Sequence, residues 1–182
     1  MIRSQLNRIW IVAVILVTAL FLFRSCVNDD DPSKGEALTV GDSLPTFSVE
    51  LNTGETVSSS SLKGKVAVIV LFNTSCPDCR AELPVVEELY QKYKDDSRVK
   101  IFGIAREESA RSIEAYWSAN GLTFPWSPQE DRKVYNLFAE SVIPRLYIAD
   151  PYGMITASYG DTDLPTLQSL EIIIQIALSQ PS

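Results

Sequence analysis

The middle of the chain carries the run NTSCPDCRAE (residues 73–82), in which two cysteines, Cys76 and Cys79, are separated by two residues. The seven residues before it, 66–72, are all apolar, which is typical of a fully buried strand. Residues 81–94 carry apolar side chains at helical spacing; the expected buried set is Leu83, Val86, Leu89, Tyr90 and Tyr93. The cysteine pair is therefore predicted to lie where a buried strand ends and a helix begins.

This junction favours redox chemistry at the two cysteines. Cys76 would lie at the start of the helix, where free backbone N–H groups and the helix dipole favour a thiolate. Cys79 would lie one turn further on and be more buried. Thiol–disulfide exchange through a mixed disulfide requires one activated sulfur and one protected sulfur. We therefore predict that Cys76 and Cys79 are the catalytic dithiol and form a redox-active disulfide when oxidised.

The spacing of the pair is also compatible with two other kinds of site. A structural zinc site needs four Cys or His ligands, whereas the chain has no histidine and its only other cysteine is Cys26, far away in sequence. No metal and no organic cofactor are therefore expected. An inert structural disulfide remains an alternative, although such a bond does not need a position between a strand and a helix.

Composition restricts the other classes of function. The chain has 182 residues, of which 46% are hydrophobic, and this is enough for one globular domain once the N-terminus is set aside. The formal net charge is −7, so no nucleic acid is expected among the partners.

The N-terminus, residues 1–26, is interpreted as an export and anchoring segment. Arg3 and Arg8 precede an apolar stretch, 9–23, which Arg24 ends. Fifteen residues are short for a spanning helix, which needs about 20, but flanking arginines can extend the span by reaching back to the interface. An uncleaved membrane anchor is favoured over the alternative, a lipoprotein signal in which Cys26 carries the lipid.

Both alternatives for the N-terminus place the soluble part outside the cytoplasm, in the periplasm or its equivalent, with the arginine-bearing end inside. Residues 27–38 are rich in aspartate and are expected to form a flexible linker. The folded domain is predicted to occupy residues 39–182.

Local patterns predict the elements of this domain. A hairpin is expected over residues 47–57, with its turn at Asn52-Thr53-Gly54. Further strands are predicted at 66–72, 99–105, 145–149 and 154–159, and helices at 81–94, 110–120, 132–138 and 165–178. This order is typical of an α/β fold in which helices cover both faces of a mixed sheet.

Three segments together resemble the TlpA/ResA type of membrane-anchored thioredoxin-like protein. They are VGDSLPTF (40–47), LKGKV (62–66) and CPDCRAELP (76–84), and the similarity extends over nearly all of residues 40–178. The resemblance implies a thioredoxin-like fold: a mixed central sheet flanked by helices, with an N-terminal β-hairpin and an inserted helix. It also implies an extracytoplasmic thiol–disulfide oxidoreductase that serves cell redox homeostasis.

The same resemblance implies the partners of the protein. Its substrates would be disulfide-bearing proteins, such as apocytochrome c before haem attachment. Its electrons would come from a membrane dithiol protein, and it would be attached to the membrane through its N-terminal anchor. The chemistry would take place in the Cys-Pro-Asp-Cys dithiol without a cofactor.

Two residues of the helix correspond to individual positions of the family. Pro84 matches a proline that kinks the active-site helix, since a proline inside a helix removes one backbone hydrogen bond. Glu82 matches a buried acid of the ResA branch. It lies three residues after Cys79 and so on the same helix face, where a carboxylate would accept the proton of Cys79. The alternative is an acid that only interacts with the helix dipole.

The substrate groove is expected on the other side of Cys76. Ile143-Pro144 precedes a predicted strand at the point where the family has a cis proline facing the dithiol. Ile143 and Pro144 would bind the substrate chain there, together with Ser75 and Pro77 beside the first cysteine.

Two residues depart from the family pattern. Ser75 replaces a common tryptophan, and Arg145 follows the proline where a small threonine is common. Arg145 would favour a thiolate if it pointed at the sulfurs, and Asp78 would oppose it. The physiological direction, reductase or oxidase, therefore stays open.

Two other functions remain as alternatives. The first is a peroxiredoxin-like thiol peroxidase, because these proteins share the fold and the opening segment 41–47. Their site needs Thr or Ser three residues before the reactive cysteine, and here that residue is Asn73. The second is a tethered binding domain without redox turnover.

Overall fold

The structure is a computed structural model that describes residues 37–179. The predicted anchor, residues 1–26, and most of the linker lie outside the described residues, so the predicted domain boundaries stay predictions. The elements are β1 (Ser48–Glu50), β2 (Thr56–Ser58), β3 (Val66–Phe72), α2 (Pro77–Tyr93), β4 (Val99–Ala105), α3 (Ala110–Asn120), β5 (Trp126–Ser127), the 3-10 helix η1 (Tyr135–Leu137), β6 (Arg145–Ala149), β7 (Ile155–Tyr159) and α4 (Leu167–Leu178).

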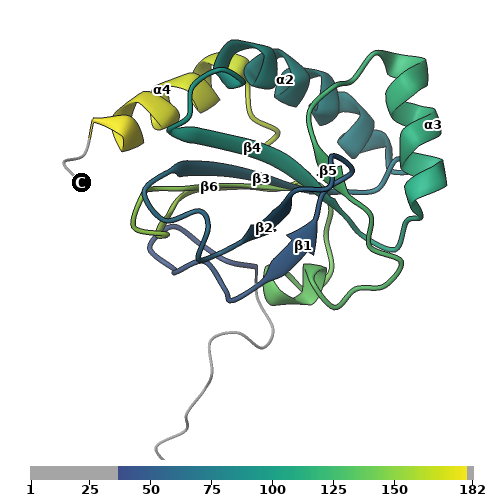
Figure 1. Cartoon of the computed structure of the whole chain (residues 1–182), viewed down its shortest axis with the longest axis horizontal. Coiled ribbons are helices and arrows are strands. Elements are labelled where there is room, and N and C mark those ends of the chain that lie inside the picture. Colours follow the sequence, from purple (N-terminus) through teal and green to yellow (C-terminus); the bar gives the residue numbers. More distant parts are fainter. Residues whose placement is uncertain (1–36, 180–182) are drawn as a thin grey trace, which may run out of the picture. The chain divides into compact units, whose positions relative to one another are not determined.

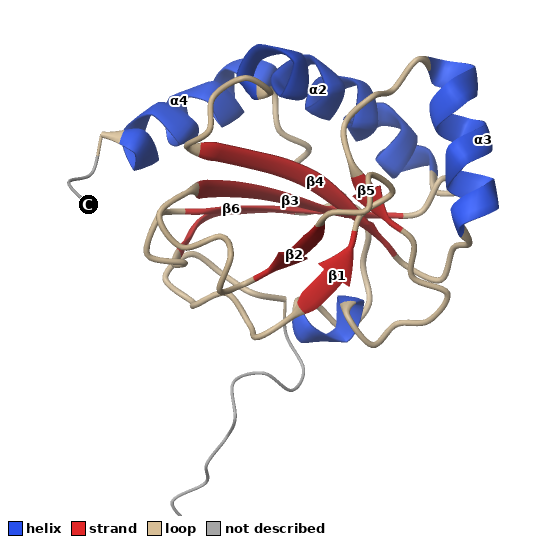
Figure 2. Ribbon diagram, viewed as in Figure 1, coloured by secondary structure: helices blue, strands red, loops and turns tan. Residues whose placement is uncertain are grey.

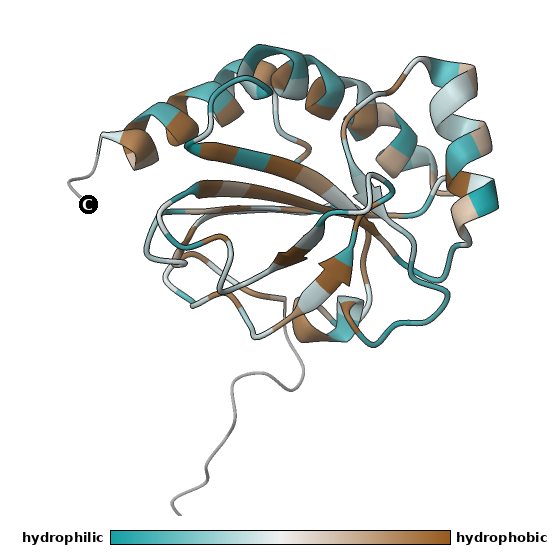
Figure 3. Cartoon of the chain, viewed as in Figure 1, coloured by the Kyte–Doolittle hydropathy of each residue, from teal (hydrophilic) through white to brown (hydrophobic). Residues whose placement is uncertain are grey.

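A mixed five-stranded sheet forms the centre, in the order β5-β4-β3-β6-β7. β3 is parallel to β4 and antiparallel to β6, while β1 and β2 form a separate hairpin. All seven residues of β3 are fully buried, as their apolar run predicts, and Figure 3 shows the central strands largely hydrophobic. The free energy of burying these side chains places β3 at the centre of the core.

The helices are distributed differently from the expectation of helices on both faces. The connections β3-α2-β4 and β4-α3-β5 cross the sheet in the same direction, and because such crossovers are right-handed, α2 and α3 lie on one face. Figures 1 and 2 show α4 beside α2 on this face, and the hairpin and η1 against the opposite one. Apart from η1, the structure describes no helix on that second face.

The second face is closed by aromatic side chains instead of a long helix. Phe47, at the start of the hairpin, packs against Phe102 of β4 and Phe138, with ring centroids 6.5 and 5.3 Å apart. Phe138 also contacts Tyr147 of β6, at 5.8 Å. The helix predicted over 132–138 is reduced to the three residues of η1, in which Tyr135 is buried.

Pro84 lies inside α2 as expected. A buried aromatic cluster joins α3 to the end of β3, the strand that leads into α2. The Trp117 ring lies 5.0 Å from the Phe72 ring and 5.0 Å from the Phe124 ring, so α3 is held against the end of β3. Gly103 on β4 leaves space for the Phe72 ring, since a Cβ at this position would lie only 2.7 Å from that ring.

Glu87 joins α2 to the connection between α3 and β5. Its carboxylate accepts hydrogen bonds from Thr123 N (2.7 Å), Thr123 Oγ1 (2.7 Å) and Phe124 N (3.1 Å). Burial opposes its ionisation, but these donors prevail and lower the pKa of Glu87. The folded state therefore gains stability from the ionised carboxylate above the unfolded pKa, and loses it as the pH falls through the folded value.

We predict that Glu87→Ala lowers the free energy of unfolding by about 1–3 kcal/mol at pH 7, because it removes the hydrogen bonds that Thr123 and Phe124 donate to a charged carboxylate. The difference from the wild type should shrink at acid pH. Urea unfolding at pH 7 and at about pH 3 checks both points. Glu88→Ala is the matched control, since Glu88 is the exposed neighbour on the same helix. Equal losses in the two variants would contradict the prediction.

Candidate active site

The two cysteines lie at the junction of β3 and α2, as predicted. Cys76 is the N-cap residue of α2 and is partly exposed, whereas Cys79 is fully buried one turn later; both are free thiols in this structure. Pro77 begins the helix, where its missing N–H costs no hydrogen bond. Ser75 and Pro77 are exposed on either side of Cys76. The structure thus brings together one accessible sulfur and one protected sulfur.

Topology brings Pro144 to the same place. β6 is antiparallel to β3, and Arg145 at its start pairs with Leu71 near the end of β3. The Ile143–Pro144 peptide bond is cis, in agreement with the expectation. The thiol of Cys76 donates to the carbonyl oxygen of Ile143, with Sγ and O 3.7 Å apart. The two segments expected to form the substrate groove therefore face each other.

Glu82 lies three residues after Cys79 on α2, and its side chain is buried. Its side chain is 2% exposed, and neither carboxylate oxygen has a hydrogen-bond partner among the described residues. Burial, with a smaller contribution from the negative charge of Asp163, raises the pKa of Glu82 to about 8. Glu82 is the sixth residue of α2, beyond the first turn in which a helix dipole acts. The dipole alternative therefore does not explain this position.

The charge of Glu82 acts on the thiol of Cys79. Burial is the main cause that raises the pKa of the Cys79 thiol, and the charges of Cys76 and Glu82 raise it further. Cys79 therefore does not ionise by itself at neutral pH. A buried group with a pKa near neutrality on the same helix face is chemically suited to take its proton.

Comparisons with known proteins agree with this geometry. The sequence pattern of the AhpC/TSA family matches residues 40–158. The chain belongs to the AhpC/TSA family. Within it, the chain is 27% identical over 149 residues to the thiol-disulfide oxidoreductase ResA of Oceanobacillus iheyensis, a match that covers 80% of this chain and 75% of ResA. The resemblance to ResA and the expected enzyme class, thiol–disulfide oxidoreductase, are thereby confirmed.

Solved structures confirm the fold of this AhpC/TSA member. StoA from Bacillus subtilis has a TM-score of 0.61 at 22% identity, over 71% of this chain and 96% of StoA. A thioredoxin-family thiol:disulfide interchange protein from Chlorobium tepidum has a TM-score of 0.65 at 23% identity, over 79% of this chain and all of that protein. The fold is therefore thioredoxin-like.

Sequence reasoning missed a buried acid that holds the loop before Cys76. Glu108, 7% exposed, follows β4 and accepts hydrogen bonds from Thr74 N (2.7 Å), from the Thr74 hydroxyl, and from Ser112 Oγ (2.8 Å). An acid after a strand has no local pattern that distinguishes it from a solvent-exposed residue. Its partner Thr74 is 34 residues away in sequence, so only the fold reveals the pair.

The described residues hold no group of three or more His, Cys, Asp or Glu side chains that would bind a metal ion. In the same part of the chain, no helix has the length and apolar character needed to cross a membrane. The guanidinium of Arg145 lies against the backbone of Gly160: a Cβ added to this glycine would be only 2.9 Å from Arg145 Nη1.

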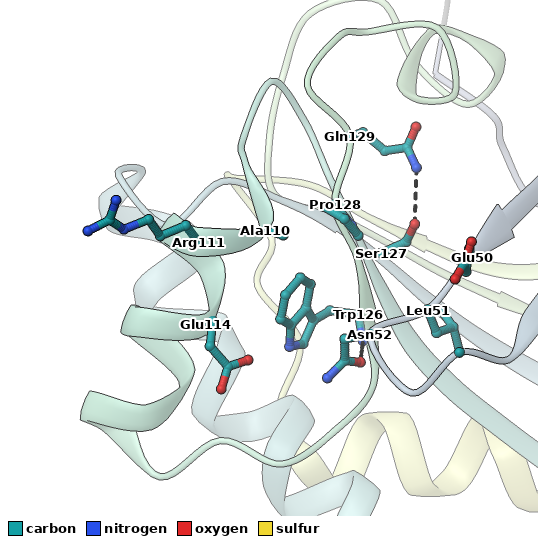
Figure 4. Close-up of a pocket in the computed structure, with 11 residues that line it drawn as sticks. Glu50, Leu51, Asn52, Ala110, Arg111, Glu114, Trp126, Ser127, Pro128 and Gln129 are labelled. Carbon is teal, nitrogen blue, oxygen red and sulfur yellow. Dashed lines mark hydrogen bonds between the residues drawn. The ribbon is translucent and has the colours of Figure 1, made fainter.

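A pocket of about 830 Å³ lies away from the dithiol. It is formed by the hairpin turn, the first half of α3 and β5, and Figure 4 shows Asn52, Arg111 and Glu114 around Trp126. None of the predicted site residues lines it. The candidate site is instead the exposed region around Cys76, which is accessible to another protein.

Proposed function

We propose that the protein reduces disulfide bonds of other proteins through Cys76 and Cys79, with Glu82 as the proton acceptor for Cys79. The observation that carries the proposal is the arrangement of the site: an accessible sulfur beside the cis proline, a buried sulfur one turn away, and an unpaired buried carboxylate on the same helix face.

The proposed reaction has two steps. In the first, the Cys76 thiolate attacks one sulfur of the substrate disulfide; the substrate S–S bond breaks, a mixed disulfide forms, and one substrate thiolate leaves and takes a proton. In the second, Glu82 accepts the proton of Cys79, whose thiolate attacks Cys76 and breaks the mixed disulfide. The second substrate thiolate leaves and takes a proton from solvent, and Glu82 returns its proton to solvent. The substrate gains two electrons and two protons, and the protein is left with a Cys76–Cys79 disulfide.

A second dithiol protein must then reduce this disulfide. No metal or organic cofactor is needed in the proposed cycle, because the two sulfurs carry both electrons. Ser75, Pro77, Ile143 and Pro144 are proposed to contact the substrate chain, since they surround the sulfur that forms the mixed disulfide.

We further propose an extracytoplasmic location. The arginine-flanked apolar segment at residues 9–23 supports a tether to the membrane, and the similarity to ResA supports a membrane dithiol donor and substrates such as apocytochrome c. A thiol reagent that cannot cross membranes, added to intact spheroplasts, tests the location. Labelling of Cys76 only after lysis would contradict it.

The equilibrium potential of the pair tests the direction of the reaction. We expect a value near that of thioredoxin, about −270 mV, for a reductase, whereas an oxidase would have about −120 mV. Equilibration of the purified protein with glutathione or dithiothreitol buffers, followed by alkylation of the free thiols, gives this value. A pair that stays oxidised under strong dithiol reductants would instead indicate a binding domain without redox turnover.

The thiol peroxidase alternative conflicts with the residue three positions before Cys76. The side chain of Asn73 donates to Arg106 O (2.9 Å) and accepts from Ser75 N (2.8 Å), so it is part of the loop and offers no hydroxyl for a peroxide. Consumption of hydrogen peroxide faster than reduction of insulin would overturn this ranking.

A further inference from the structure

The segment that leads into Pro144, residues 140–143, is held by side chains along its whole length. We name it the approach segment. Each of its four consecutive carbonyl oxygens accepts one hydrogen bond from a side chain. The pairs are Arg132 Nη2 to Glu140 O (2.5 Å), Arg106 Nη1 to Ser141 O (2.7 Å), Tyr135 Oη to Val142 O (2.8 Å) and Cys76 Sγ to Ile143 O (3.7 Å).

Three of these donors form one compact group. The guanidinium carbons of Arg106 and Arg132 lie 5.1 and 5.2 Å from the centre of the Tyr135 ring, within the range of cation–π attraction. The carboxylate of Glu107 lies 3.9 Å from Arg106 Nε and 3.7 Å from Arg132 Nη1. Glu107 has a φ of +56°, a strained value that non-glycine residues adopt where the surroundings impose it.

Arg106 also contacts the opposite wall of the groove. Its backbone carbonyl accepts a hydrogen bond from Asn73 Nδ2, and the other side of the Asn73 amide accepts from Ser75 N. Arg106 thus connects the loop that carries Cys76, through its backbone, with the approach segment, through its side chain. Among the four side-chain donors to the approach segment, Arg106 is the one that also bonds the Asn73 side chain.

We propose that Arg106, supported by Tyr135, is a positioning residue for protein substrates. It holds the approach segment at a set distance from Cys76, so that a polypeptide lying against Ile143 and Pro144 presents its disulfide to the sulfur. A small disulfide needs only to collide with the exposed Cys76, and its reaction does not depend on this geometry. The inference rests on the proposed function and adds the residue that favours polypeptide substrates over small ones.

The test compares two disulfides on the same protein. Arg106→Met removes the donor and the charge at similar length, Arg106→Lys keeps both, and Tyr135→Phe removes a single hydroxyl. Arg98→Met is the matched control, because Arg98 lies at the opposite end of β4 and pairs only with Asp96 in a largely exposed position. Each variant is assayed for kcat/KM with insulin and for its rate with the small disulfide DTNB, and its melting temperature is measured.

We expect kcat/KM with insulin to fall about ten-fold in Arg106→Met and about three-fold in Tyr135→Phe, as misplacement of a bound substrate predicts. The rate with DTNB should change less than about two-fold. Arg106→Lys should recover most of the insulin activity, and Arg98→Met should match the wild type in both assays.

Two results overturn the inference. One is an equal fall for insulin and DTNB, which means general damage to the site; the other is an unchanged insulin rate in both Arg106→Met and Tyr135→Phe. If Arg106→Met does not fold, the comparison in Tyr135→Phe decides. A wild-type protein that reacts with DTNB but does not reduce insulin refutes the proposed function itself, and the positioning role with it.

Discussion

Replacement of Cys76 by serine is expected to abolish disulfide reduction, with a loss of at least about a thousand-fold in kcat/KM for insulin, because the variant lacks the attacking sulfur. The fold should be retained, since Cys76 is partly exposed and serine also suits an N-cap position. Insulin turbidity with dithiothreitol as electron source measures the loss. Residual turnover above the rate with dithiothreitol alone would contradict a nucleophilic Cys76.

Replacement of Cys79 by serine should have a different result. Cys76 still attacks the substrate, but no second thiol resolves the mixed disulfide, so the covalent complex accumulates. Non-reducing electrophoresis detects this complex, and dithiothreitol releases it. Cys76→Ser is the control that should form no complex. If Cys76→Ser formed the complex and Cys79→Ser did not, the two roles would be exchanged.

Replacement of Glu82 by glutamine should slow the second step by about a hundred-fold at pH 7, which is the usual contribution of a general base. Because the pKa of Glu82 is raised to about 8, the wild-type rate of this step should increase with pH until about 8. The variant should lack this inflection. Single-turnover release of a fluorescent peptide from the mixed disulfide, measured between pH 6 and about 9, gives both profiles.

The control for this step is Glu88→Gln, an exposed change on the same helix that should alter neither rate nor profile. A Glu82→Gln protein with the wild-type rate and inflection would exclude the proton-acceptor role. The carboxylate would then be a buried acid without a catalytic task.

The same residue makes stability depend on pH. The folded state keeps the proton of Glu82 up to about pH 8, whereas the unfolded chain releases it near the ordinary pKa of 4.5. Between these values the folded state binds more protons, so its stability falls as the pH rises, by up to about 5 kcal/mol in total. Glutamine carries no ionisable proton, so Glu82→Gln should be more stable than the wild type at pH 9 and similar at pH 4. Urea unfolding at both values measures this.

Some elements could be predicted because their causes are local. The apolar run of β3 and the helical spacing of α3 have the bounds expected, 66–72 and 110–120. The start of α2 at Pro77 confirms that Cys76 lies at the beginning of the helix. Apolar periodicity alone marks the helix only from residue 81, because its first turn exposes Pro77, Asp78 and Arg80. The last helix, predicted over 165–178, runs over Leu167–Leu178; it buries Leu170, Ile174 and Ala177, whereas Ile176 is exposed.

The residues around the site were predictable to different degrees. The spacing of Cys76 and Cys79 was enough to identify the pair. Glu82 and Pro144 were identified from the resemblance to a family. Glu108 and Arg106 have no such signal, because their partners Thr74 and Ser141 are 34 and 35 residues away. In the sequence, each resembles an ordinary charged residue after a strand. Its hydrogen-bond partner is seen only in the folded structure.

The sequence alone was sufficient to predict the dithiol, its position between a buried strand and a helix, and the class of chemistry. These features depend on apolar periodicity and cysteine spacing, which involve only a few neighbouring residues. Only the tertiary structure decided that α2, α3 and α4 share one face of the sheet and that Glu82 is buried without a hydrogen-bond partner. It alone showed that four carbonyls before Pro144 are held by side chains. These features depend on which strands become neighbours, and that choice minimises exposed apolar area over the whole domain rather than within any one segment.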